Sequence, residues 1–335
     1  MERLDPIFIV GVPRSGTTLL VNMLGAHPLL APIYETRFLR NLLVLCERLC
    51  WFNGDSLSRS CSRLLGESFI RRRMLGACEN FRKKAIAFSY VPPVQRGNKQ
   101  DYESFPFGKG YCIHYSLEEL AAETDLWLAK VRSGHLAHEE VWRSARTYIE
   151  RLFAIHCARM GRPHWINKTP GFLNHLDGLS TLFPQAKYLN MIRDGRDVAV
   201  SNLSLPWGPK TVREAARRWK KLIRMGQNSM ETKRLKNVTL HYEEFVRSPR
   251  EVLGTVYNFL ELDGDIDRAA ASMRVFGGRC GVWRTRFTAK DRAVFAKEAG
   301  DLLIALGYED GYDWVHSRTS RAAKLNLGRE NNEPR

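Results

Sequence analysis

The sequence has no long apolar run. No stretch reaches about 18 consecutive apolar residues, the length that a membrane-spanning helix needs, so we expect no transmembrane segment. The first six residues, MERLDP, mix both charge signs and precede only a short apolar run, which is not the pattern of a signal peptide. We therefore expect a cytoplasmic protein, and we leave peripheral contact with a membrane open.

Cysteines are few and lack the spacing of a metal site. The seven cysteines are scattered, and none lies in a C-x-x-C pair. An odd number without an export signal favours reduced thiols. Cys46 and Cys50 lie one helical turn apart, which we interpret as core packing. Because no H-E-x-x-H or other ligand spacing is present, we predict no metal.

Acidic residues are the scarcer charge. The chain has 52 Lys and Arg against 36 Asp and Glu, a net charge of +16, which favours anionic ligands, nucleic acid or acidic membrane surfaces. Residues 40–100 hold 12 Lys and Arg against 4 Asp and Glu, with the densest runs at 71–73 and 82–84. A solvated helix face and a functional patch both fit this segment. Because its basic runs lack interleaved aromatic residues, we expect no nucleic-acid partner.

Short apolar runs alternate with helical patterns along much of the chain. Residues 7–12 are an apolar run that includes a glycine, which predicts a buried strand, and a helical pattern follows at 15–28. The alternation returns with predicted strands at 164–168, 187–192 and 237–242, each followed by a predicted helix. This order predicts an α/β, P-loop-like three-layer fold, with a central parallel sheet flanked by helices.

Between about 38 and 160 the pattern changes to helical periodicity alone. A polar stretch with proline and glycine interrupts it, and we expect a loop at 91–110. We predict a single domain over residues 1–317 that carries this segment as a helical insertion. Residues 318–335 are polar and basic, and we expect a disordered tail there.

The loop after the first strand has an unusual composition. GVPRSGTT, residues 11–18, has the glycine spacing of a phosphate-binding loop, G-x-x-x-x-G-K-[ST], but Thr17 stands in place of the lysine. The glycines and the following helix start favour an anion, and Arg14 and nearby hydroxyls add donors. No obvious acidic strand end follows to hold Mg²⁺. The loop therefore suits an anion whose transfer needs no metal.

These residues carry a resemblance to a known family. VGVPRSGTTLL, residues 10–20, resembles the loop of sulfotransferases that binds the 5′ end of 3′-phosphoadenosine-5′-phosphosulfate (PAPS). A transferred sulfuryl group carries less negative charge than a γ-phosphoryl group, which fits the missing metal ligands. The resemblance implies that the cofactor is held here by Arg14, Ser15, Gly16, Thr17 and Thr18.

A second motif resembles the 3′-phosphate site of that family. In YLNMIRDGRDVAVSNL, residues 188–203, Arg193 stands at the end of a predicted strand and Ser201 lies about two turns into the next helix. The resemblance implies that both bind the 3′-phosphate beside the first loop. Without it, the same residues would fit a strand followed by a charged helix start capped by Asp194.

A third motif, GRCGVWRTRFT at 278–288, is similar to the late loop that closes over the adenosine in this family. Val282 departs from the aspartate usual in the cytosolic branch, and the usual leading Arg-Lys is absent. The alternative interpretation of the segment is a glycine-rich turn with a buried tryptophan. Among the matching positions, the resemblance assigns cofactor contacts to Gly281, Trp283 and Arg284, with Gly278 alongside, and Tyr242 matches a further cofactor-contacting residue.

The resemblance also implies the residues of the reaction. AHPLLAPIYETRFL, residues 26–39, is similar to the segment that carries the catalytic glutamate of the protein-tyrosine branch, which makes Glu35 the expected base. Lys168 matches a lysine that contacts the bridging oxygen of the leaving group, and Arg14 would assist it. The cytosolic branch uses a histidine instead, so the insertion histidines 114, 135 and 138 remain alternative bases.

The resemblance covers residues 7–37, 164–262 and 274–308 and favours the protein-tyrosine and bacterial branches. It implies metal-independent, in-line transfer of a sulfuryl group from PAPS to a hydroxyl of a peptide, a carbohydrate or a small metabolite. Acceptor choice should lie in residues 38–160. Two alternatives stay open at this point: a P-loop kinase or NTPase with a degenerate loop, and a nucleotide-binding protein without catalysis.

Overall fold

The structure is a computed structural model, and it describes residues 4–54, 67–89, 115–133, 136–273 and 277–316. The loop expected at 91–110 and the tail expected at 318–335 lie outside the described residues. In the described part, no helix has both the length and the apolar character needed to cross a membrane.

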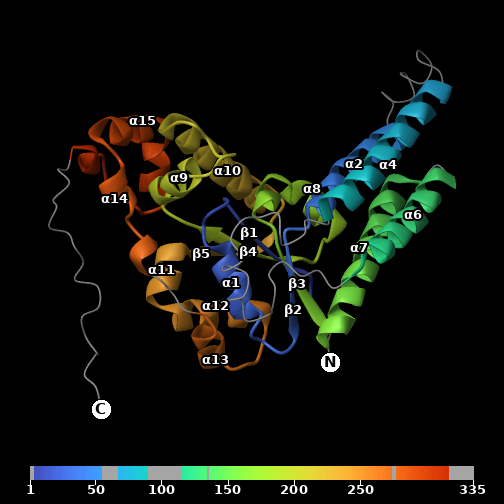
Figure 1. Cartoon of the computed structure of the whole chain (residues 1–335), viewed down its shortest axis with the longest axis horizontal. Coiled ribbons are helices and arrows are strands. Elements are labelled where there is room, and N and C mark those ends of the chain that lie inside the picture. The colour runs from blue at the N-terminus through green and yellow to red at the C-terminus, as the bar shows by residue number, and fades with distance from the viewer. Residues whose placement is uncertain (1–3, 55–66, 90–114, 134–135, 274–276, 317–335) are drawn as a thin grey trace.

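The centre of the fold is a five-stranded sheet in which all neighbouring strands are parallel (Figure 1). The strand order is β2-β3-β1-β4-β5. This confirms the predicted central parallel sheet. The strands are β1 (Ile7–Gly11), β2 (Leu30–Tyr34), β3 (His164–Lys168), β4 (Lys187–Ile192) and β5 (Lys236–His241).

Strand β2 is the one strand that sequence analysis did not predict. It holds only five residues, and Pro32 lies in its middle, opposite Ile166 of β3. Proline cannot donate a backbone hydrogen bond, so it is found mainly in edge strands. Here β2 forms one edge of the sheet and pairs with β3 on one side only.

Alternating side chains of the strands supply two hydrophobic cores. In β1, Ile7 and Ile9 belong to one core, and Phe8 and Val10 belong to the other. The first core is closed by α1 (Thr17–Leu24), α11 (Tyr242–Arg247), α12 (Pro249–Leu260) and α13 (Ile266–Ala271). The second is closed by α8 (Leu176–Leu182), α9 (Gly195–Leu203), α10 (Val212–Thr232) and α15 (Ala289–Ala305). The predicted three-layer arrangement is confirmed.

Four long helices form a projecting arm, seen at the upper right of Figure 1. They are α2 (Arg37–Gly54), α4 (Glu67–Ser89), α6 (Leu117–Ser133) and α7 (His138–Met160). Cys46 and Cys50 are buried in the core that the arm shares with the sheet, as predicted. The described part of the insertion is therefore helical, and its base packs on β2 and β3 through α7.

Shorter elements complete the fold. Sequence analysis predicted one helix after the strand at 164–168, and the structure has a 3₁₀ helix, η2 (Pro170–Asn174), followed by α8. Late in the chain come η3 (Gly277–Arg279), α14 (Trp283–Arg286) and η4 (Asp313–Val315). Of these, α14 packs on α9 and η4 packs on α15 (Figure 1).

The parallel strands bring distant parts of the chain to one edge. In an open parallel sheet, ligands bind outside the carboxyl ends of the strands. The residues at or just after these ends include Gly11, Glu35, Lys168, Arg193 and Tyr242. The fold therefore places at least one residue of every sequence motif discussed above at the same edge, apart from the late loop.

Candidate active site

The loop between β1 and α1 turns sharply before the helix begins. Arg14 (φ 79°) and Gly16 (φ 90°) both have left-handed backbone conformations. A Cβ atom on Gly16 would lie 2.3 Å from Cδ2 of the Tyr242 ring, so only glycine fits there. The Ser15 hydroxyl is fully buried and has no hydrogen-bond partner among the described residues. Thr17 is buried and Thr18 is half-buried in the first turn of α1.

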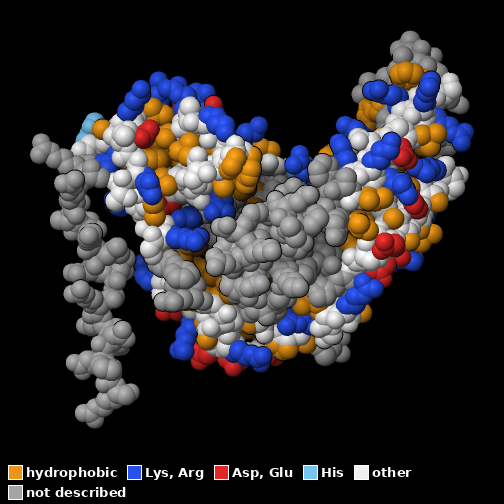
Figure 2. Space-filling view, viewed as in Figure 1, with side chains coloured by type: hydrophobic (Ala, Val, Ile, Leu, Met, Phe, Trp, Pro, Cys, Tyr) orange, Lys and Arg blue, Asp and Glu red, His pale blue; other side chains and the backbone are white. Residues whose placement is uncertain are grey.

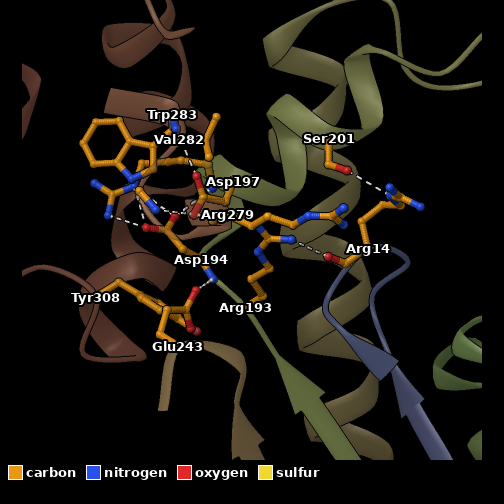
Figure 3. Close-up of polar contacts among 12 residues, drawn as sticks. Arg14, Arg193, Asp194, Asp197, Ser201, Glu243, Arg279, Val282, Trp283 and Tyr308 are labelled. Carbon is orange, nitrogen blue, oxygen red and sulfur yellow. Dashed lines mark hydrogen bonds and ion pairs between the residues drawn. The ribbon is translucent and has the colours of Figure 1, made fainter. Parts of the chain in front are cut away.

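Arg14 contacts the second motif directly (Figure 3). Its Nε donates a hydrogen bond of 2.8 Å to Oγ of Ser201, which lies in α9. Arg193, at the end of β4, donates to the Arg14 carbonyl oxygen at 3.0 Å. The side chains expected at the two phosphate sites therefore converge, with both motifs in contact at the same edge of the sheet.

Arg193 also holds the late loop and rests on an aromatic ring. It donates to the carbonyl oxygen of Arg279 at 2.5 Å, and its guanidinium carbon lies 4.4 Å from the centroid of the Tyr242 ring, close enough for a cation–π contact. Its Nε is buried and has no partner among the described residues. Tyr242 is therefore packed between Gly16 and Arg193, which links the first and second motifs.

The late loop is attached to the start of α9 by one carboxylate. Asp197 accepts hydrogen bonds from the backbone N–H groups of Gly281 (2.7 Å) and Trp283 (2.9 Å), as Figure 3 shows. Burial raises the pKa of Asp197 above its ordinary value. Sequence analysis did not single out Asp197, although it lies inside the second motif. Its partners are more than 80 residues away, so only the fold reveals this contact.

Trp283 and Arg284 differ in exposure. Trp283 is only 1% exposed, and its ring lies 3.8 Å from the guanidinium carbon of Arg196. This agrees with the alternative that the segment is a turn with a buried tryptophan, and a cofactor contact of its ring stays a prediction. Gly281 has φ 71°. Arg284 is exposed, and its guanidinium lies 4.7 Å from the centroid of the Trp283 ring.

A buried polar network holds Asp194, the residue that follows Arg193, and so supports the end of β4. Asp194 caps α9 by accepting from the backbone N–H of Arg196, and the two side chains form an ion pair at 2.8 Å. Arg196 also pairs with Glu309. Sequence analysis missed both Arg196 and Glu309, because the second residue comes from the far end of the chain.

Glu243 and Tyr308 form a second part of this support (Figure 3). Glu243 accepts a hydrogen bond from the Asp194 backbone N–H at 3.0 Å, and the Tyr308 hydroxyl donates to its other carboxylate oxygen at 3.1 Å. Burial raises the pKa of Glu243 above its ordinary value. His241 contacts the Tyr308 hydroxyl at 3.3 Å, so its ring is part of this packing.

Glu35 and Lys168 face each other at the ends of β2 and β3. Tyr34 and Lys168 are partners in the register of these strands, and Glu35 follows directly. The Lys168 ammonium donates to Oε1 of Glu35 at 3.1 Å. Lys168 is buried, while the Glu35 side chain is 29% exposed. A partly exposed carboxylate beside a buried ammonium is a pair that can exchange a proton with an incoming group and stabilise a developing negative charge.

Of the three insertion histidines considered as alternative bases, only His138 lies in the described residues. His138 is exposed in the first turn of α7, in the arm. Residues 114 and 135 lie outside the described part. His27 is buried, contacts the Asp263 carbonyl at 3.0 Å and accepts from the Leu29 N–H at 3.2 Å, so its ring is part of the packing there. The described residues contain no group of three or more His, Cys, Asp or Glu side chains that could hold a metal ion.

Comparison with known proteins gives several matches. Protein-tyrosine sulfotransferase 1 of Danio rerio is 24% identical over 262 residues, which cover 76% of this chain and 53% of that protein. Protein-tyrosine sulfotransferase A of Caenorhabditis elegans is 24% identical over 265 residues, covering 77% and 50%. The chain thus spans about half the length of these curated relatives.

Among solved structures, the chain is similar to the sulfotransferase domain of the Synechococcus PCC 7002 olefin synthase. The TM-score is 0.47 at 18% identity, with 89% of this chain and 96% of that chain covered. A sulfotransferase from Mycobacterium avium gives a TM-score of 0.44 at 15% identity, with 92% and 78% covered.

The family comparison covers most of the sequence. The model described as "Sulfotransferase family" matches residues 6–85 and 111–267. These ranges include the loop after β1, the segment with Glu35, the end of β3 and the motif at the end of β4. The resemblance drawn from those motifs is confirmed, and the chain belongs to the sulfotransferase family.

Proposed function

We propose that this chain transfers a sulfuryl group from PAPS to the hydroxyl of an acceptor. The observation that carries the proposal is the convergence of two anion-binding elements, since Arg14 contacts Ser201 and Arg193 contacts the Arg14 carbonyl. A nucleotide with phosphates at both the 5′ and 3′ positions needs two such elements side by side. The Glu35–Lys168 pair lies at the carboxyl ends of β2 and β3, at the same edge of the sheet.

Two buried donors fit the phosphates of this cofactor. The Ser15 hydroxyl and the Arg193 Nε are buried without partners among the described residues. Buried polar groups are normally hydrogen-bonded, so these two unpaired donors at the carboxyl edge of the sheet are an argument for a ligand. Phosphate oxygens accept strong hydrogen bonds from such groups. We assign Ser15, with the backbone at the start of α1, to the 5′ side and Arg193 with Ser201 to the 3′ side.

The proposed reaction is a displacement at sulfur. PAPS supplies an activated sulfuryl group on its 5′-phosphate. The acceptor oxygen forms a bond to sulfur, the bond from sulfur to the bridging phosphate oxygen breaks, and that oxygen keeps the electron pair. Glu35 takes the acceptor proton, while the ammonium of Lys168 and the guanidinium of Arg14 stabilise the charge on the leaving phosphate. No step in this scheme assigns a role to a metal ion.

The acceptor is proposed from the relatives and the arm. The curated relatives are named protein-tyrosine sulfotransferases, so a tyrosine-containing peptide is the first acceptor to test, before carbohydrates and small hydroxyl metabolites. The arm exposes Arg71, Arg72 and Arg73 on α4, and blue side chains are visible along it in Figure 2. We propose that these residues favour an acidic acceptor.

One assay tests the proposed function. Purified protein is incubated with ³⁵S-labelled PAPS and pools of peptide, carbohydrate and small-molecule acceptors, with and without EDTA. Label transfer that EDTA does not reduce is expected. Binding of PAPS without transfer would instead support a non-catalytic nucleotide-binding protein. Binding of ATP alone, or transfer that needs Mg²⁺, would contradict the proposal and support a P-loop kinase or NTPase.

A further inference from the structure

We propose that Thr36, Asn167 and Thr169 form a buried positioning network that sets the direction of the Glu35 carboxylate. This inference rests on the proposed function, because it takes Glu35 as the base. The motifs that suggested the reaction assign no role to any of these three residues. Thr36 follows Glu35 in the sequence, and Asn167 and Thr169 flank Lys168. Hydrogen bonds among the three connect the segment that carries Glu35 to the segment that carries Lys168.

The backbone at Glu35 needs such support. Its φ of 45° lies in the left-handed region, which residues other than glycine rarely adopt. The Glu35 N–H still donates to the Lys168 carbonyl at 2.8 Å, which continues the pairing of β2 with β3 by one residue. The chain then turns away into α2. A strained residue persists only where its surroundings hold it, and such residues gather at functional sites.

The surroundings here are a chain of side-chain hydrogen bonds. The Thr36 N–H donates to the Thr169 hydroxyl at 3.2 Å, and the Thr169 hydroxyl donates to Oδ1 of Asn167 at 2.9 Å. The amide of Asn167 in turn donates to the Thr36 hydroxyl at 2.9 Å. The Thr36 backbone N–H and the three side chains therefore close a ring between the end of β2 and the end of β3. Their exposed fractions are 1% for Thr36, 0% for Asn167 and 8% for Thr169.

The ring holds the backbone next to both members of the Glu35–Lys168 pair. Thr36 follows Glu35 directly, and Asn167 and Thr169 flank Lys168. Because successive side chains of a strand point to opposite faces, Asn167 and Thr169 lie on one face while Lys168 points to the other. The ring thus holds the backbone of both segments from the opposite face of β3, while the Nζ of Lys168 lies 3.1 Å from Oε1 of Glu35. The three residues act through Glu35 and are positioning residues.

The test compares two variants at the same position. Thr36→Val keeps the shape but removes the hydroxyl that Asn167 contacts, and Thr36→Ser keeps the hydroxyl. A small misplacement of a catalytic group can lower the rate about a hundredfold. We therefore expect Thr36→Val to lower kcat about tenfold or more and Thr36→Ser to keep kcat close to that of the wild type. Affinity for adenosine 3′,5′-bisphosphate, measured by calorimetry, should not change. The pair Thr169→Val and Thr169→Ser provides the same comparison if Thr36→Val does not fold.

A matched control removes a buried threonine hydroxyl far from the site. Thr124 is fully buried in the arm and donates to the Leu120 carbonyl at 2.6 Å. Thr124→Val should lower the melting temperature without lowering kcat. If Thr124→Val lowers kcat as much as Thr36→Val does, the effect is one of general stability, and the proposed positioning role is wrong.

The Glu35→Gln background separates this inference from the proposed function. If Thr36 acts through Glu35, Thr36→Val should reduce the residual rate of Glu35→Gln by much less than it reduces the wild-type rate. Equal factors in the two backgrounds, or equal kcat for Thr36→Val and Thr36→Ser, overturn the positioning role while leaving the base role intact. Wild-type turnover by Glu35→Gln overturns the base role itself.

Discussion

Arg14 and Ser201 are 187 residues apart in the sequence, and Nε of Arg14 donates a hydrogen bond of 2.8 Å to Oγ of Ser201. One residue comes from the loop before α1 and the other from α9, so the contact joins two elements on neighbouring strands of the sheet. In the proposed function, the same contact joins the 5′ and 3′ sides of one nucleotide site. The predictions below begin with this pair.

Ser201→Ala should weaken binding of adenosine 3′,5′-bisphosphate. The variant removes a hydroxyl that contacts Arg14 and is proposed to contact the 3′-phosphate, and a hydrogen bond to a charged group contributes about 1.5 kcal/mol or more. We expect roughly a tenfold loss of affinity by calorimetry. Ser204→Ala is the matched control, since the Ser204 hydroxyl donates only to the Ser201 carbonyl at the end of the same helix. Equal losses in both variants would contradict the assignment.

Gly16→Ala should be far more damaging than an alanine at another left-handed glycine. At Gly16 the new Cβ would lie 2.3 Å from a carbon of the Tyr242 ring, whereas at Gly161 (φ 64°) no atom lies within 4 Å. Gly161→Ala carries only the penalty of placing an alanine in the left-handed conformation, about 1–2 kcal/mol. The free energy of unfolding, measured with urea, should fall by more for Gly16→Ala. Similar decreases would mean that Tyr242 does not pack against the loop.

Glu243→Gln should change how stability depends on pH. Burial raises the pKa of Glu243 above its ordinary value of 4.5 in the folded protein. The folded state therefore binds more protons than the unfolded state just above pH 4.5, and the free energy of unfolding falls as the pH rises through the folded pKa. Glutamine keeps an oxygen to accept from the Asp194 N–H but does not titrate.

The measurement for this prediction is urea unfolding of both proteins from pH 4.5 to neutral pH. The free energy of unfolding of Glu243→Gln minus that of the wild type should increase with pH. A difference that stays constant or decreases would show that the Glu243 carboxyl group is not held in a raised-pKa environment. Glu244→Gln, one residue further along α11, is a suitable control.

Replacing the exposed arginines of the arm should affect the acceptor and not the cofactor. Arg71, Arg72 and Arg73 together changed to serine should raise the KM for an acidic acceptor peptide several-fold, and the effect should shrink at high salt. The KM for PAPS should not change. A triple variant of three exposed lysines elsewhere, Lys221, Lys233 and Lys290, should leave both constants unchanged. If the two triple variants behave alike, the arm does not select the acceptor.

The sequence predicts those parts of the structure that depend on local patterns. The glycines before α1 and the apolar runs of β1, β3, β4 and β5 each carry their signal within a few residues, and the order of these runs is enough for a parallel sheet. Strand β2 was not predicted, because it has only five residues and contains Pro32, which is atypical of a strand. Without β2, the sequence does not explain why Glu35 meets Lys168, since this contact depends on the pairing of β2 with β3.

The support of the site could not be predicted, because its partners are distant in the sequence. Arg196 is held by Glu309, and Glu243 by Tyr308, and no motif links either pair. Trp283 shows the opposite situation. Its motif implied a contact with the cofactor, which stays a prediction, and the structure shows that its ring is buried against Arg196. A local motif identifies a residue type at a position, but the face that it presents depends on tertiary packing.

The central claim is that one nucleotide site holds both a 5′- and a 3′-phosphate. The most direct measurement compares the affinities of the protein for adenosine 3′,5′-bisphosphate, 5′-AMP and 3′-AMP by calorimetry under the same conditions. The bisphosphate should bind at least tenfold more tightly than either monophosphate, because only it meets both anion-binding elements at once. Equal affinities for the bisphosphate and 5′-AMP would contradict the claim.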